Sequence, residues 1–214
     1  MIDCLPSDAS PLSSSALIVI VSGLPRSGTS MLMRMLQAGG LPLLTDGKRS
    51  PDPDNPLGYF EYEPVKALDR GDAAWLEAAA GKATKIVSAL LVQLPHVLAR
   101  RYVVLFMRRP MAEILASQRR MLQRRGADAD AVPDDRMAEV YRAHLSDVDR
   151  WIDTREDVLR LDVPFVDVIA EPRAEAATIA ALLRREANVI LDEAAMAKAV
   201  EPDLYRNRAL GSTP

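Results

Sequence analysis

The sequence has a single cysteine, Cys4, among its 214 residues. One thiol excludes an intramolecular disulfide and a zinc site made of cysteines. The first residues also lack the basic start and the apolar middle of a secretory signal peptide. The protein is therefore expected in the reducing environment of the cytoplasm.

Long hydrophobic runs and an excess of positive charge are missing as well. The longest uninterrupted aliphatic stretch, residues 16–21, falls far short of the roughly 20 apolar residues of a membrane-spanning helix. Lys and Arg total 27 against 30 for Asp and Glu, so the formal net charge is −3. Because general nucleic-acid binders are usually basic, neither a nucleic-acid partner nor a membrane span is expected.

What the sequence does contain is the composition of a soluble globular domain, with 49% hydrophobic and 27% charged residues. Residues 1–15 are rich in serine and proline and are expected to be a flexible lead-in. Residues 16–208 are expected to form a single domain, and residues 209–214 a tail.

Apolar runs alternate with segments of helical composition along this domain. Strands are predicted at residues 16–22, 85–88, 102–107 and 165–169. Helical segments are predicted at residues 29–38, 63–80, 94–100, 110–124, 136–154, 174–185 and 192–199. The alternation predicts an α/β fold, with a parallel β-sheet of about four or five strands flanked by helices on both faces.

The loop after the first predicted strand has the spacing of a phosphate-binding loop, G-x-x-x-x-G, from Gly23 to Gly28. The two glycines let backbone N–H groups turn inward, and these groups together with the start of a helix favour an anion. Side chains that can add hydrogen-bond donors are those of Arg26, Ser27, Thr29 and Ser30. An anion site is therefore predicted where this strand ends.

One position departs from the nucleotide-triphosphatase form of this loop. The lysine that normally follows the second glycine is replaced by Thr29, which argues against ordinary binding of ATP or GTP. The predicted strand at 102–107 is followed by Arg108 and Arg109, whose charge has the wrong sign for holding a metal ion. No metal site is predicted.

A second candidate anion site follows that strand. Ser117 lies eight residues after Arg109, in the helix that Pro110 begins, and two helical turns rise about 11 Å. Arg109 can turn back from the strand end, so that the arginine and the serine face one phosphate from different sides. A solvated arginine pair and an ordinary helix serine remain an alternative interpretation of the same residues.

Two stretches, VSGLPRSGTSML and VLFMRRPMAEILASQ, resemble the two signature segments of sulfotransferases that use 3′-phosphoadenosine 5′-phosphosulfate (PAPS). The P-R-S-G-T form of the first is similar to that of tyrosylprotein sulfotransferases. Residues 55–68 (NPLGYFEYEPVKAL) and 200–208 (VEPDLYRNR) resemble a bacterial sulfotransferase-like group. The resemblance covers most of residues 16–208.

The resemblance implies a fold related to P-loop kinases and a metal-independent, in-line transfer of a sulfuryl group from PAPS. The acceptor would be a hydroxyl or an amine of a small molecule or a peptide, and the other product would be adenosine 3′,5′-bisphosphate. Arg26 would bind the bridging and sulfuryl oxygens, and Arg109 and Ser117 the 3′-phosphate, with Arg108 as a competitor for Arg109. The implied PAPS-binding residues are Gly23, Pro25, Arg26, Ser27, Gly28, Thr29, Ser30, Arg109 and Ser117.

The general base is the part of the family pattern that this sequence does not match. Cytosolic sulfotransferases use a histidine on the strand before the second segment; Ser88 falls about there, and neither His96 nor His144 fits well. Other sulfotransferases use a carboxylate, and the candidates around the long loop at 46–59 are Asp46, Glu61 and Glu63. Glu61 is the first choice for the base and Asp46 the second.

Two other functions remain as alternatives. One is a small-molecule kinase of the P-loop fold, and the other is a nucleotide-binding sulfotransferase-like protein without catalysis. Candidates for lining an acceptor pocket are Tyr59, Phe60 and Trp75. Arg206 and Arg208 are candidates for folding back over the donor.

Overall fold

The structure is a computed structural model that describes residues 17–97, 100–129 and 131–205. In this part of the chain four strands form one sheet, all parallel, in the order β2–β1–β3–β4. The strands are β1 (Leu17–Gly23), β2 (Ala83–Lys85), β3 (Arg101–Arg108) and β4 (Val158–Pro164). The predicted α/β class with a parallel sheet is confirmed.

The two central strands, β1 and β3, are apolar on both faces because helices cover the sheet on both sides. They pair in register from Leu17 opposite Arg101 to Gly23 opposite Met107, so both end at the same edge. That edge is where a parallel sheet with crossover helices exposes its loops to ligands. The two predicted anion sites therefore start from neighbouring strand ends.

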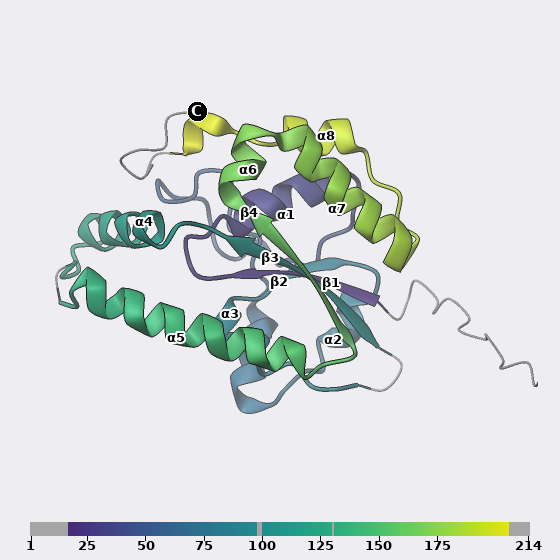
Figure 1. Cartoon of the computed structure of the whole chain (residues 1–214), viewed down its shortest axis with the longest axis horizontal. Helices are drawn as coiled ribbons and strands as arrows, with labels where there is room; N and C mark the ends of the chain where they lie inside the picture. The colour runs from purple at the N-terminus through teal and green to yellow at the C-terminus, as the bar shows by residue number, and fades with distance from the viewer. Residues whose placement is uncertain (1–16, 98–99, 130, 206–214) are drawn as a thin grey trace, which may run out of the picture.

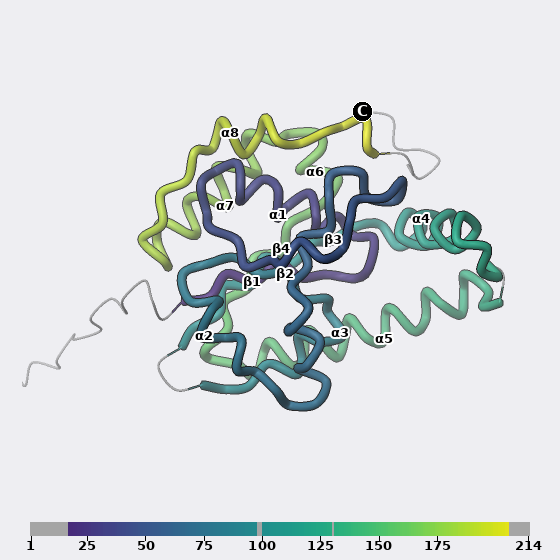
Figure 2. The backbone as a smooth tube through the Cα atoms, turned by 180° about the vertical axis from the view of Figure 1, so that it is seen from behind, coloured from purple at the N-terminus to yellow at the C-terminus, as the bar shows by residue number. Residues whose placement is uncertain are grey.

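Two layers of helices sandwich the sheet, as Figure 1 shows from one side and Figure 2 from behind. On one face lie α1 (Thr29–Ala38), α6 (Phe165–Ala170), α7 (Pro172–Ala187) and α8 (Glu193–Lys198). On the other lie the 3₁₀ helix η2 (Glu63–Arg70), α2 (Leu76–Ala79), α3 (Ser88–Leu91) and α5 (Asp134–Asp153). The remaining elements are α4 (Met111–Arg124), which packs against α5, and the short η3 (Pro202–Leu204).

The fourth strand differs from the prediction. Residues 165–169 form helix α6 rather than a strand, and the strand is the preceding segment, Val158–Pro164. Pro164 has no N–H to continue the sheet and supplies a fixed backbone angle for the start of a helix. Phe165 and Val168 then face the core three residues apart, which is helical spacing that a short apolar run conceals.

Other boundaries also needed correction. The helix predicted over 63–80 is broken at Gly71, whose φ of +77° ends η2, and only α2 follows it. The short strand predicted at 85–88 is β2, which ends at Lys85, and Ser88 instead begins α3. The helical turn predicted at 94–100 is not formed over residues 94–97 and at Arg100; residues 98–99 lie outside the described part.

No helix within residues 17–97, 100–129 and 131–205 has the length and apolar character that crossing a bilayer requires.

Candidate active site

A cavity of about 420 Å³ lies beyond the ends of β1 and β3. Three parts of the chain form its walls: the loop between β1 and α1, the end of β3 with α4, and the long loop that includes Arg49 and Glu61. Residues after α8 complete one side, among them Tyr205. The cavity has the size and position of a small-molecule site in an α/β protein.

The loop after β1 has a tight conformation that depends on its glycines. Ser27 N–H donates to the Leu24 carbonyl at 3.1 Å, and the N–H groups of Met31 and Leu32 donate to Gly28 as α1 begins. Gly28 has a φ of +106°, and a Cβ there would lie 2.5 Å from the Phe165 ring. Only glycine fits this position. The first turn of α1, which begins directly after it, has N–H groups that no carbonyl of the helix can satisfy.

Most of the predicted loop residues line the cavity. They are Gly23, Pro25, Arg26, Gly28, Thr29 and Ser30. Ser27 is different, because its side chain is 1% exposed and its hydroxyl is buried beneath the loop. Ser27 is not among the residues that line the cavity, and its hydroxyl has no hydrogen-bond partner in the described part of the chain.

Arg26 connects the loop to two other walls of the cavity. Its Nε donates to Ser117 Oγ on α4 at 3.0 Å, and its Nη2 donates to the Asp54 carbonyl at 3.1 Å. Burial lowers the pKa of Arg26, while the nearby Asp54 carboxylate acts in the opposite direction. A partly buried guanidinium at this place is a strong donor to an oxyanion.

The two consecutive arginines after β3 point in different directions. Arg109 lines the cavity, and its Nη1 donates to the carbonyl of Arg26 at 3.0 Å. Arg108 instead donates to Asp149 on α5 at 2.8 Å and to Asp162 on β4 at 3.1 Å. Of the two candidates for the second anion site, the structure brings Arg109 together with Ser117 and the first loop.

Lys85, the last residue of β2, is a cavity residue that the sequence reasoning did not single out. Its Nζ donates to Ser30 Oγ at 3.1 Å and to the Tyr59 carbonyl. Burial lowers the pKa of Lys85 from 10.5 to about 8. The signal that could have found it is a short strand that ends in a lysine next to β1, because parallel neighbours present their carboxyl ends at one edge.

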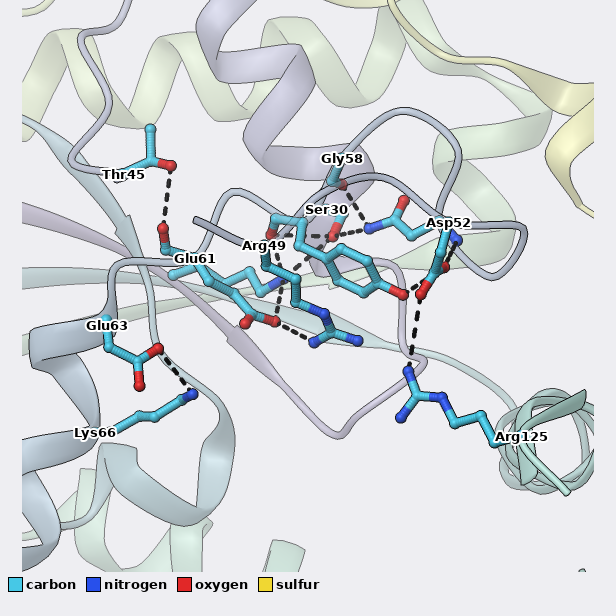
Figure 3. Close-up of polar contacts among 12 residues, drawn as sticks. Ser30, Thr45, Arg49, Asp52, Gly58, Glu61, Glu63, Lys66 and Arg125 are labelled. Atoms are coloured by element: carbon cyan, nitrogen blue, oxygen red, sulfur yellow. Dashed lines mark hydrogen bonds and ion pairs between the residues drawn. The ribbon is translucent and has the colours of Figure 1, made fainter. Parts of the chain in front are cut away.

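Of the three carboxylates considered as a general base, only Glu61 lines the cavity. It lies 2.8 Å from Arg49 and 3.8 Å from Lys85 (Figure 3). Asp46 instead accepts from the N–H groups of Glu63 at 2.8 Å and Lys48 at 3.1 Å, and these hydrogen bonds lower its pKa. Glu63 is an exposed partner of a surface lysine, away from the cluster in Figure 3.

The long loop is held by polar contacts of its own. The Arg49 guanidinium lies 3.3 Å from the centre of the Tyr59 ring, and the Tyr59 hydroxyl donates to Asp52 at 2.7 Å. Asn55 Nδ2 donates to Ser30 Oγ at 2.8 Å, which joins the loop to the start of α1. Arg125, which directly follows α4, pairs with Asp52 at 3.8 Å (Figure 3).

The aromatic candidates for an acceptor pocket separate. Tyr59 lines the cavity, whereas Trp75 is buried in the core on the α5 side of the sheet and Phe60 packs against the core on the α1 side. Neither Trp75 nor Phe60 lines this cavity, and core packing, the usual role of such aromatic residues, accounts for both. Arg206 and Arg208 lie outside the described residues.

The histidines lie away from this cavity. His144 Nε2 and Ser88 Oγ are 2.9 Å apart between α5 and α3, and neither lines the cavity. His96 is exposed and does not line the cavity. Over the described parts of the chain, no three His, Cys, Asp or Glu side chains gather as a metal ion would require.

Positive charge dominates the cavity. Among the described residues that line it, seven are cationic and three are acidic. The cations are Arg26, Arg34, Arg49, Lys85, Arg109, Arg124 and Arg125, and the acids are Asp54, Glu61 and Glu201. This balance suits a ligand with several negative charges.

No protein-family profile and no curated protein sequence matches this chain. Among solved structures, the sulfotransferase domain from the curacin biosynthetic pathway matches with a TM-score of 0.49 and 14% identity, over 90% of this chain and 92% of its own. The sulfotransferase domain from the Synechococcus PCC 7002 olefin synthase matches at 0.47 and 17%, over 97% and 92%. A sulfotransferase from Alicyclobacillus acidocaldarius matches at 0.46 and 15%, over 87% of each chain. These bacterial proteins are of the class that the two sequence segments resemble.

Proposed function

We propose that this chain is a PAPS-dependent sulfotransferase that acts on a hydroxyl or an amine. The observation that carries the proposal is the convergence of both predicted anion sites on one cavity. Arg26 and Ser117 are 91 positions apart and hydrogen-bonded, and Arg109 reaches the carbonyl of Arg26 across 83 positions. A donor with a 5′-phosphosulfate and a 3′-phosphate needs two such sites close together.

The residues present fit this donor. The N-terminal turn of α1, with the Thr29 and Ser30 hydroxyls, offers donors for the 5′-phosphate, and Arg109 with Ser117 offers donors for the 3′-phosphate. PAPS supplies the activated sulfuryl group when it is bound. Thr29 in place of a P-loop lysine is compatible with this assignment, because Lys85 brings an ammonium to Ser30 from the adjacent strand.

Arg26, Lys85 and Glu61 are the residues that we assign to the chemistry. Arg26 and Lys85 place fixed positive charge beside the loop, where negative charge on the transferred group and the leaving oxygen is stabilised. Glu61 faces the same cavity and is the carboxylate that takes the proton from the acceptor. Asp46 is the weaker candidate, because its oxygens are engaged by backbone N–H groups.

Thermal unfolding with adenosine 3′,5′-bisphosphate tests donor recognition, with AMP, ADP and ATP as comparison ligands in EDTA and then in magnesium. At a hundred times its Kd the bisphosphate stabilises by about 2.7 kcal/mol, a shift of roughly 5 to 10 °C for a chain of this size. The shift should occur in EDTA, exceed that with AMP and be lost in Arg109→Ala. A shift only with ATP and magnesium would contradict the proposal and favour a kinase.

Turnover is tested with radiolabelled PAPS and a panel of phenols, alcohols and amines. Glu61→Gln should abolish transfer while the bisphosphate still raises the melting temperature. Glu63→Gln is the matched control, because that carboxylate is exposed and outside the cavity, and it should transfer normally. Binding of the bisphosphate without transfer to any member of the panel would favour a nucleotide-binding protein without catalysis.

A further inference from the structure

A buried carboxylate lies directly behind Arg109. Glu113 is in the first turn of α4, four residues after Arg109, and its side chain is 1% exposed. Its Oε2 accepts from Arg109 Nε at 3.0 Å. Burying an ionised carboxylate costs free energy, and a paired cation compensates for that cost only in part. Filling space in the core is therefore not a sufficient reason for this pair.

The second oxygen of Glu113 is also occupied. Oε1 accepts from the Tyr205 hydroxyl at 2.5 Å, a contact that crosses 92 positions of sequence. Tyr205 packs edge-on against Phe165, with ring centres 5.2 Å apart, and Arg109 lies 4.3 Å from the centre of the Phe165 ring. The carboxylate is therefore fixed on one side by Arg109 and on the other by the chain after η3.

These contacts determine the orientation of the Arg109 guanidinium at the cavity. Glu113 holds its Nε edge, the Arg26 carbonyl holds Nη1, and the Phe165 ring supports one face of the plane. A long arginine side chain otherwise loses rotamer freedom when it binds an anion, and fixing it beforehand removes that cost at the moment of binding. The side chain of Arg109 is itself only 8% exposed.

We propose that Glu113 is a positioning residue that orients Arg109 toward the 3′-phosphate and so sets the preference for a 3′,5′-bisphosphate over a 5′-monophosphate. Tyr205 supports it by holding the Glu113 carboxylate from the opposite side. The proposal rests on the proposed function, because it assigns the 3′-phosphate to Arg109. Glu113 contacts the arginine rather than the ligand, so its effect appears only in the part of the affinity that the 3′-phosphate adds.

The measurement is the ratio of the Kd for AMP to the Kd for adenosine 3′,5′-bisphosphate, by calorimetry on the full chain. Glu113→Gln keeps the shape of the side chain but removes its charge. The hydrogen bond that holds Arg109 is then weaker, because hydrogen bonds to charged groups are stronger than those to neutral ones. We expect the ratio to fall about ten- to a hundred-fold. The Kd for AMP should change little. A merely structural role would weaken both ligands together.

Asp157→Asn is the matched control. Asp157 is also a buried carboxylate, and it is paired with Arg155 at 2.6 Å. It directly precedes β4, however, and so lies at the amino ends of the strands, whereas the cavity lies at their carboxyl ends. Its loss should lower the melting temperature and leave the ratio as in the wild type. A comparable fall of the ratio in Asp157→Asn would overturn the proposal, because general destabilisation would then explain the effect.

Two further variants cover the case in which Glu113→Gln does not fold. Tyr205→Phe removes only the hydroxyl behind Glu113 and should lower the ratio by about three- to tenfold. In an Arg109→Lys background, Tyr205→Phe should cause no further fall, because the arginine that it orients is gone. An unchanged ratio in Tyr205→Phe with Glu113→Gln unfolded, or an unchanged ratio in a folded Glu113→Gln, overturns the proposal.

The wild-type protein separates this inference from the proposed function. A wild-type ratio near one means that there is no 3′-phosphate site, which overturns the proposed function and the role of Glu113 with it. A large wild-type ratio that persists in Glu113→Gln overturns the role of Glu113 alone.

Discussion

The three parts of the chain around the cavity group into two walls that are constructed differently. The first wall consists of Gly23–Ser30, Arg109 and Ser117, and hydrogen bonds between side chains and backbone far apart in sequence hold it together. The second wall consists of Arg49–Glu61 and Lys85. Many of its contacts are between residues of one loop, such as Arg49 with Glu61 and Tyr59 with Asp52. The side chain of Arg49 is 39% exposed, against 8% for Arg109 in the first wall.

The difference shows which part of the site is fixed before a ligand arrives. A Cβ at Gly28 in the first wall would strike the Phe165 ring, whereas Gly47, at the start of the long loop, and Gly58 have open space around the same position. A tightly packed wall suits a ligand that never changes, and a loop with open space can accommodate different partners. Under the proposed function, this difference favours the first wall for the donor and the second for the acceptor.

Among the changes that compare the two walls, the largest effect should come from Lys85, the buried cation of the second wall. Lys85→Met keeps most of the length of the side chain but removes the charge beside Ser30. Transfer from radiolabelled PAPS should fall about 10²- to 10³-fold, the usual cost of removing a group that stabilises charge in the transition state, while the bisphosphate Kd changes much less.

Lys66→Met is the control for this change, because Lys66 is 62% exposed and outside the cavity, and it should leave transfer unchanged. An equal loss of donor affinity and turnover in Lys85→Met would contradict the division of labour between the walls.

The same small substitution should affect the two walls unequally. Gly28→Ala combines a φ of +106° with a Cβ 2.5 Å from the Phe165 ring, and should lower the free energy of unfolding by about 3 kcal/mol. Gly58→Ala, in the second wall, has a φ of +96° and no atom within 4 Å of the added Cβ, so only the backbone cost of about 1 kcal/mol remains. Urea unfolding measures both, and equal losses would show that packing does not distinguish the walls.

The sequence was most informative where local chemistry determines structure. The buried run before Gly23, the helix over Thr29–Ala38 and the second buried strand all lie within a residue or two of their predicted ends in the described part of the chain. Continuous β-branched runs and glycines with fixed roles leave few alternatives. The order of the loop residues was therefore enough to predict an anion site at the end of β1.

The sequence was less informative for a short apolar run and for residues that depend on a neighbouring strand. The run at 165–169 is compatible with a strand and with a helix, and the local signal for helix α6 is Pro164 immediately before it. Lys85 becomes a cavity residue because β2 pairs with β1, and Glu113 becomes buried because Arg109 and Tyr205 close over it. Such long-range pairings cannot be derived from spacing along one chain.

The smallest expected effect is a pH dependence that belongs to the second wall. Burial holds the pKa of Lys85 at about 8, against 10.5 ordinarily. Below pH 8 folded and unfolded chains both carry the proton, so the full cost of burying the ammonium is present. Between pH 8 and 10.5 the unfolded chain binds more protons than the folded one, so stability rises with pH in that window.

Comparison with Lys85→Met isolates this contribution from that of other titrating groups. The free energy of unfolding of the wild type, relative to the variant, should increase by about 2 kcal/mol between pH 7 and pH 9.5, from urea titrations at both pH values. Over the same range transfer by the wild type should fall more steeply than its affinity for the bisphosphate, because the neutral amine no longer stabilises charge on the transferred group. A constant difference in stability would mean that Lys85 is not held in a desolvated site, and the second wall would then be as open at Lys85 as it is around Gly58.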